Sequence, residues 1–129
     1  MAGQHLRTRN VVRLGWLGTL TNRAEELAAF YRDVLQLPLV RSEPGCWVYG
    51  LPDGALVEVF APGYGRDHFQ TGPVAGFAVD DLSAARDELL QRGIVLVGQP
   101  GPTWQHFRGP DGNVYELVAS GTAPGSNPE

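Results

Sequence analysis

The chain has 129 residues, enough for one domain with a proper core or for two small units that share one. Its 14 acidic and 10 basic residues give a net charge of -4, which argues against nucleic acid or an anionic membrane as the main partner, because phosphates need a basic surface. The single cysteine, Cys46, excludes a framework of intramolecular disulfides and a zinc site with several cysteines.

The two ends of the chain look unlike the rest. Residues 1–10 are polar and lack the apolar stretch of a secretory signal, and no apolar run approaches the length of a membrane span. We therefore expect a cytoplasmic protein with a flexible N-terminus over residues 1–10. Residues 120–129 are rich in Gly, Pro and Ser and cannot bury enough apolar surface to order themselves, so we expect a disordered tail.

The first predicted unit covers residues 11–62 and opens with the apolar run VVRLGWLGTL, which is typical of a strand. A helix should follow, with Asn22 as its N-cap and Glu25 completing a capping box. Four apolar residues fall on one helical face and should be buried: Leu27, Phe30, Tyr31 and Val34. Three short strands are then predicted, at about 38–43, 46–50 and 55–61. A Gly-rich loop over residues 63–73 connects this unit to the next.

The second predicted unit covers residues 74–119 and opens with a similar apolar run within PVAGFAV. Asp80 or Asp81 can cap its helix, and Gly93 supplies the left-handed residue that ends it. The buried stripe of this helix is Leu82, Ala85 and Leu89. Strands are predicted at about 94–98, 103–108 and 113–119.

The two units repeat one pattern. An offset of 58 residues carries Glu58 onto Glu116, and it carries the Pro-Asp-Gly turn of the first unit onto that of the second. Asp53 and Asp111 belong to these turns, which join the last two strands of each unit. Each unit therefore reads βαβββ, and the predicted fold class is α+β with the unit duplicated.

This duplicated pattern, with FYRDVLQL in the first helix and GPDGNVYEL near the end, resembles the vicinal oxygen chelate superfamily. That superfamily includes glyoxalases, bleomycin-resistance proteins, fosfomycin-modifying enzymes and extradiol dioxygenases. The resemblance covers roughly residues 11–119. It implies a curved mixed sheet that forms a cup, with the helices on the outer face, built within one chain or across two. The bleomycin-resistance members are dimers, and we expect a homodimer here.

The resemblance also implies a metal position. In metal-dependent members, four inward positions on the first and last strands of the units hold one divalent ion, and here these positions fall on Trp16, Glu58, Val74 and Glu116. The indole nitrogen carries a proton and valine has no donor atom, so only two carboxylates remain as ligands. We therefore expect no tightly bound cofactor. A hard divalent ion held loosely by Glu58 and Glu116, with water completing its shell, stays open.

Strand alternation indicates what else lines the cup. Phe60 shares the face of Glu58. Resemblance to the fosfomycin-modifying members implies that Trp104 and His106 point inward, and we expect Trp47 and Tyr49 opposite them, whereas His68 in the connecting loop should be solvated. The predicted ligand-binding set is Trp16, Trp47, Tyr49, Glu58, Phe60, Trp104, His106 and Glu116. Aromatic rings stack on planar molecules or cations, and carboxylates bind amines or guanidinium groups, so this set favours a small-molecule site.

Several functions fit this site. The first is a binding protein of the bleomycin-resistance type for a drug or metabolite, aromatic or cationic, without a full metal site. The second is a glyoxalase-like lyase or isomerase, or a dioxygenase-like enzyme, with Glu58 or Glu116 as general base and His106 as acid or hydrogen-bond donor. The third is a dimeric scaffold whose cup is filled by its own side chains. The carboxylates could also form structural bridges to Arg13, Arg41 or Arg108.

Overall fold

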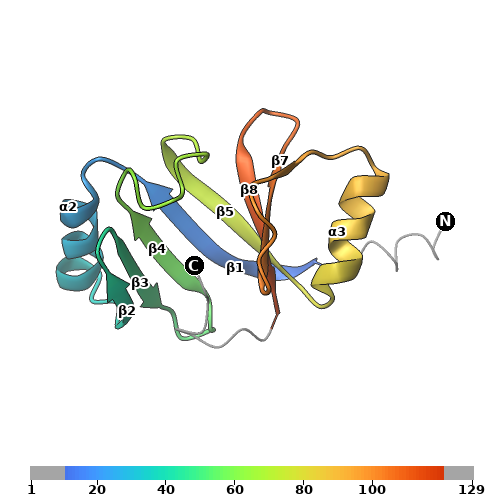
Figure 1. Ribbon diagram of the computed structural model, residues 1–129. Helices are drawn as coiled ribbons and strands as arrows, with labels where there is room; N and C mark the ends of the chain where they lie inside the picture. Colours follow the sequence, from blue (N-terminus) through green and yellow to red (C-terminus); the bar gives the residue numbers. More distant parts are fainter. Residues whose placement is uncertain (1–10, 121–129) are drawn as a thin grey trace.

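The computed structural model describes residues 11–120, which form one curved eight-stranded sheet with a helix at each end (Figure 1). The first half contributes β1 (Val11–Leu20), α2 (Ala24–Ala29) continued by the π-helical turn η1 (Phe30–Val34), β2 (Leu39–Glu43), β3 (Cys46–Gly50) and β4 (Leu56–Phe60). The second half contributes β5 (Gly72–Val79), α3 (Leu82–Gln91), β6 (Leu96–Val97), β7 (Trp104–Arg108) and β8 (Val114–Ala119). The predicted α+β fold of two βαβββ units is confirmed. The predicted flexible N-terminus, and the predicted tail beyond residue 120, lie outside the described residues.

The strand order is β2-β3-β4-β1-β5-β8-β7-β6, so the two halves meet where β1 pairs with β5. β1 runs parallel to β4, and β5 runs parallel to β8. Gly18 lies opposite Glu58 in the first pair, and Gly76 lies opposite Glu116 in the second. The offset of 58 residues is therefore present in the register of the sheet, and both units form one sheet within one chain.

The turns between the last two strands of each unit have the predicted chemistry. Gly54 and Gly112 have φ angles of 91° and 87°, which an L side chain rarely adopts. Asp53 Oδ1 accepts a hydrogen bond from Ala55 N at 2.9 Å, and Asp111 Oδ1 accepts one from Asn113 N at 3.1 Å. The repeated aspartates therefore shape the turns.

The start of the first helix differs from the prediction. Asn22 does not cap it: the N-cap residue is Arg23, which has no side-chain cap, and the side chain of Arg23 pairs with Glu26 at 2.6 Å. The predicted face is also wrong at Phe30 and Val34, which are 45% and 62% exposed. The cause is the π turn, in which Leu35 N donates to Phe30 O, because its extra residue ends the 3.6-residue spacing.

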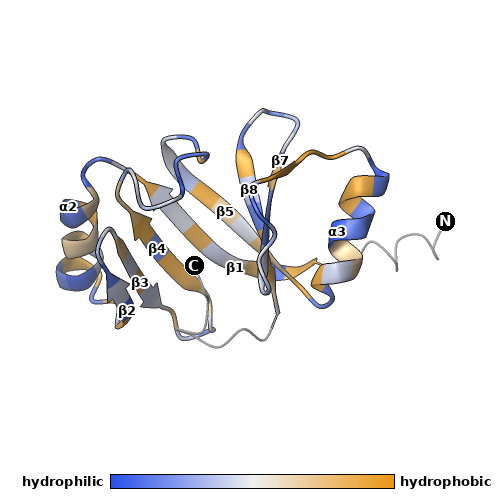
Figure 2. Cartoon of the chain, in the orientation of Figure 1, coloured by the Kyte–Doolittle hydropathy of each residue, from blue (hydrophilic) through white to orange (hydrophobic). Residues whose placement is uncertain are grey.

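The second helix follows the prediction. Asp81 Oδ1 accepts a hydrogen bond from Ala84 N at 3.0 Å, which identifies Asp81 rather than Asp80 as the N-cap. Leu82 and Ala85 are buried against the sheet, and Gly93 ends the helix with a φ of 79°. The other face of α3 is polar (Figure 2). No helix in residues 11–120 is long and apolar enough to span a membrane.

The two faces of the sheet carry separate cores. Both helices pack on one face, where α2 covers β3 and β4 and α3 covers β5 and β8. The opposite, concave face is the cup. Its buried apolar residues are Trp16, Cys46, Val48, Leu56, Phe60, Phe69, Val74, Ala78, Val114 and Val118. The cup is thus a packed core that draws on both halves of the chain.

Candidate functional site

Glu58 and Glu116 lie at matching places in the cup and are both 0% exposed. Buried carboxylates are costly unless they are hydrogen-bonded. Trp16 Nε1 donates to Glu58 Oε1 at 2.6 Å, and His106 Nε2 lies 2.7 Å from Glu116 Oε1. Each carboxylate is therefore held by one ring nitrogen from a neighbouring strand. The partners are not symmetric, because Trp16 lies on the strand before its helix and His106 on the strand before the last.

Two glycines make room for the indole of Trp16. A Cβ atom on Gly18 would lie 2.1 Å from the Cη2 atom of Trp16, and one on Gly76 would lie 2.9 Å from its Cβ atom. The indole thus lies flat over β1, toward Glu58, where any larger residue at position 18 would meet it. Glycines on the two central strands position the donor of this hydrogen bond.

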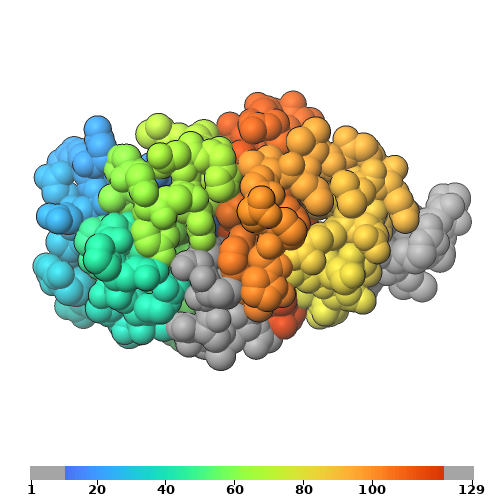
Figure 3. All heavy atoms as spheres, viewed as in Figure 1, coloured from blue at the N-terminus to red at the C-terminus, as the bar shows by residue number. Residues whose placement is uncertain are grey.

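The connecting segment, residues 61–71, covers the cup. Phe69 is 4% exposed, and its ring centroid lies 6.0 Å from that of Trp16, 5.9 Å from that of Phe60 and 4.9 Å from that of His106. The guanidinium of Arg66 lies over the rings of Phe60, Tyr64 and Trp104, 5.6 to 5.9 Å from their centroids. In Figure 3 the light green atoms of the segment gather at the surface between the two halves. The segment therefore supplies a plug of aromatic rings and one cation.

Polar contacts reach from this segment to both carboxylates. His68 Nε2 lies 2.9 Å from His106 Nδ1, so His68, His106 and Glu116 form a chain. On the other side, the hydroxyl of Tyr64 donates to Glu43. Arg41 Nη1 donates to Glu43 at 3.1 Å, and Arg41 Nη2 lies 3.7 Å from Glu58 Oε2. Of the three arginines considered as bridging partners, Arg41 is the one that the structure places beside a cup carboxylate.

Burial sets the protonation of this site. Burial, to which the positive charges of His68 and Arg66 add, lowers the pKa of His106 to about 3. His106 is therefore neutral at pH 7, and one ring nitrogen donates while the other accepts. Its contact with Glu116 is a hydrogen bond of a neutral imidazole and not an ion pair. Burial, followed by the negative charge of Glu58, raises the pKa of Cys46 to about 12, so its thiol is no nucleophile at pH 7.

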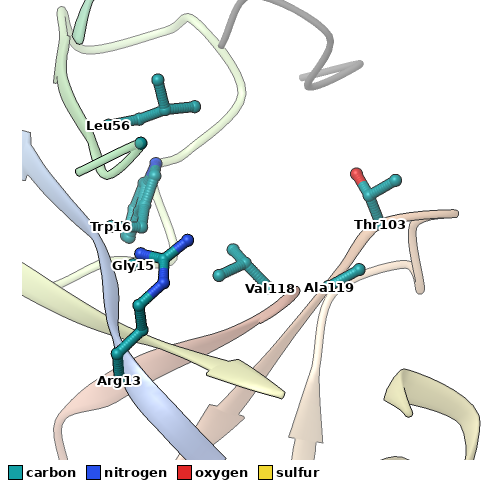
Figure 4. A pocket seen from close by; sticks show the side chains of 8 residues that line it. Arg13, Gly15, Trp16, Leu56, Thr103, Val118 and Ala119 are labelled. Atoms are coloured by element: carbon teal, nitrogen blue, oxygen red, sulfur yellow. The ribbon is translucent and has the colours of Figure 1, made fainter. Parts of the chain in front are cut away.

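The cup leaves little free space. A cavity of about 20 Å³ lies beside Trp16, and Figure 4 shows it between β1, Leu56 and the side chains of Val118 and Thr103. Such a volume holds about one water molecule. A ligand the size of a drug can therefore enter only if the connecting segment moves away.

Six of the eight predicted ligand-binding residues do face the cup: Trp16, Glu58, Phe60, Trp104, His106 and Glu116. The predicted orientation of Trp47 and Tyr49 is wrong. Both pack on the helix side, where the hydroxyl of Tyr49 donates to Ala28 O at 2.8 Å. Because cross-strand partners share a face, Val48 opposite Glu58 points into the cup instead. The offset of 58 residues maps His106 onto Val48, which agrees with this placement.

Comparison with known proteins decides the family. The family model described as Glyoxalase/Bleomycin resistance protein/Dioxygenase superfamily matches residues 13–117. The chain belongs to this superfamily. Among proteins with curated descriptions, none matches the chain.

Solved structures agree with the superfamily fold. A methylmalonyl-CoA epimerase from Mycobacterium tuberculosis has a TM-score of 0.66 at 22% identity, over 85% of this chain and 89% of that chain. A methylmalonyl-CoA epimerase in complex with methylmalonyl-CoA and NH4+ has a TM-score of 0.64 at 16% identity, over 88% and 98%. An NAD-dependent benzaldehyde dehydrogenase from Legionella pneumophila has a TM-score of 0.61 at 13% identity, over 81% and 96%. At these identities the likeness shows the fold alone.

The residues present do not fit the metal centre of the superfamily. Trp16 directs a protonated nitrogen at Glu58, and Val74 offers no donor atom. Within residues 11–120, no three side chains of His, Cys, Asp or Glu are placed to share one ion. The chemistry of this cup is therefore derived from its own side chains.

Sequence reasoning missed three residues of the site: His68, Phe69 and Arg41. His68 was expected to be solvated, which is wrong, because it is half-buried against His106 and Phe69. One signal could have found this segment. The run YGRDHF places two aromatic residues, an arginine and a histidine within a Gly-rich loop, and such side chains are unusual in a loop that only spans a gap.

Proposed function

We propose that this protein is a metal-independent binding protein of the bleomycin-resistance type, which takes an aromatic cation into its cup when the connecting segment opens. The observation that carries the proposal is the pair of fully buried carboxylates, Glu58 and Glu116, in a cup otherwise walled by aromatic and aliphatic side chains. A cation on a planar ligand would meet these carboxylates by charge-assisted hydrogen bonds.

The position of Phe69 supports an aromatic ligand. Its ring fits among the rings of Trp16, Phe60 and His106, and a planar ligand could take the same place once Phe69 leaves. One solved relative is a methylmalonyl-CoA epimerase in complex with methylmalonyl-CoA and NH4+. Here two buried carboxylates would repel an anionic ligand, which favours a cation for this chain.

An enzymatic role for these residues has less support. His106 is neutral at pH 7 because its pKa is lowered to about 3, so it is a poor general acid. Glu58 accepts a hydrogen bond from Trp16, which weakens it as a base. A scaffold with a permanently filled cup is the second candidate, and the cavity of about 20 Å³ favours it.

Titration calorimetry with two matched probes separates these functions. We expect p-aminobenzamidine, a planar cation, to bind more tightly than p-aminobenzamide, which has the same shape without the charge. Glu58→Gln and Glu116→Gln should each weaken amidine binding at least tenfold, because a hydrogen bond to a charged group contributes about 1.5 to 3 kcal/mol. Absence of binding for both probes would support the scaffold and contradict the proposal.

A further inference from the structure

Two polar chains attach the connecting segment to the two carboxylates, and we name them latches. The first latch runs from Tyr64 through Glu43 and Arg41 to Glu58. The second latch runs from His68 through His106 to Glu116. Each latch begins on the segment and ends on one carboxylate.

The remaining contacts of the segment are suited to a hinged element. Its ends are fixed to the sheet, since Ala61 N donates to Gly45 O at 2.9 Å and Gln70 Oε1 accepts from Val114 N at 2.9 Å. Between these anchors, Phe69 N donates to Arg66 O within the segment itself. Gly63 has a φ of 88° and open space around it, so the backbone can change direction there.

We propose that residues 61–71 form a lid whose opening is coupled to cation binding at Glu58 and Glu116, through these two latches. A cation at Glu58 competes with the guanidinium of Arg41, which also holds Glu43 and thereby Tyr64. A cation at Glu116 competes with His106, which holds His68. Binding in the cup thus loosens both attachments of the lid.

Coupling of this kind is reciprocal, so it predicts the behaviour of variants. A ligand that binds only the open form has an apparent affinity reduced by the fraction of closed lid. Removal of a latch should raise the open fraction, and with it the affinity, by the same factor. The ligand class rests on the function proposed above, whereas the latches themselves can be tested without any ligand.

The ligand-free experiment measures trypsin cleavage after Arg66 in the full chain, which requires the lid to open. Tyr64→Phe and His68→Phe keep the rings and remove one latch contact each. We expect each to speed cleavage roughly fivefold, as the loss of one net hydrogen bond would. Glu58→Gln and Glu116→Gln should also speed it, although both residues lie beneath the lid. Unchanged cleavage in the four variants would overturn the proposal.

A matched control is Tyr115→Phe, which removes a tyrosine hydroxyl that donates to Asp111 in the turn between β7 and β8. It should leave cleavage after Arg66 unchanged, and an equal increase would mean that general loosening explains the effect. The ligand arm measures p-aminobenzamidine affinity by calorimetry. Tyr64→Phe and His68→Phe should tighten binding about as much as they speed cleavage. Faster cleavage with unchanged or weaker binding would overturn the coupling. Faster cleavage without binding in any variant would contradict the proposed function and leave the latches established.

Discussion

Trp16 and Gly18 show how closely single residues are fitted in the cup. The indole of Trp16 covers Gly18 so tightly that a Cβ atom at position 18 would overlap it. The same indole donates the hydrogen bond that holds Glu58. A methyl group at position 18 therefore disturbs both the packing and the polar contact.

Gly18→Ala should lower the free energy of unfolding by about 2 kcal/mol, which is typical of overpacking in a core. In a Trp16→Phe background the cost should be smaller, because the ring atoms that meet the new methyl group are then gone. Urea unfolding of the two single variants and the double variant measures this coupling. An equal cost of Gly18→Ala in both backgrounds would contradict the described fit.

The buried His106 gives the protein a pH dependence of known sign. In the folded protein its pKa is lowered from 6.5 to about 3, so between these values the unfolded chain binds a proton that the folded chain does not. Stability is therefore full above pH 6.5 and decreases as the pH falls. From pH 7 to pH 5 this group should remove about 2 kcal/mol. Urea unfolding at both pH values should show this extra loss in the wild type relative to His106→Gln, and equal losses would contradict it.

At this scale the sequence predicted the carboxylates and failed on the residues around them. Glu58 and Glu116 could be placed because the repeat fixes their register. Trp47 and Tyr49 could not, because a shift of one residue in a strand exchanges its two faces, and aromatic residues suit either face. His68 and Phe69 lie in a loop without periodicity, so no pattern of spacing assigned them to the cup.

The two helices differ in how their first turns are stabilised. The side chain of Asp81 caps α3, whereas no side chain caps α2 and Asn22 is exposed. The sequence predicted a cap at both places, since Asn and Asp are equally good N-caps. The difference arises because the chain entering α2 makes Arg23 the N-cap residue, and local sequence does not determine that geometry.

Substitution of the two residues checks this difference. Asp81→Ala should lower the free energy of unfolding by about 1 kcal/mol through loss of the cap. Asn22→Ala should change it by less than about 0.5 kcal/mol, as other exposed substitutions do. Thermal or urea unfolding of both variants is sufficient, and a larger loss for Asn22→Ala would contradict the observed cap.

For the whole molecule, the repeat and the turn residues were enough to predict the fold and the superfamily. They could not predict that the cup is closed, because closure depends on contacts between the connecting segment and strands from both halves. The homodimer stays a prediction, but the surface offers a place for it. Leu14 is 61% exposed on a central strand, and its partner Phe77 places it on the face that carries the helices.

We expect a second copy to cover this part of β1, and Leu14→Glu should then convert the dimer to a monomer. Val95→Glu is the matched control, because Val95 is also 61% exposed but follows α3 in a loop. Sedimentation equilibrium should give twice the chain mass of 14.0 kDa for the wild type and the control. A monomeric wild type would contradict the expected dimer.

The central claim is that the cup accepts an aromatic cation beneath a lid. A crystal structure of the protein grown with p-aminobenzamidine tests it most directly. The claim predicts the amidinium within hydrogen-bonding distance of Glu58 or Glu116, its ring in the place of Phe69, and residues 61–71 displaced. A closed cup at saturating probe, or an amidine bound only outside the cup, would contradict it.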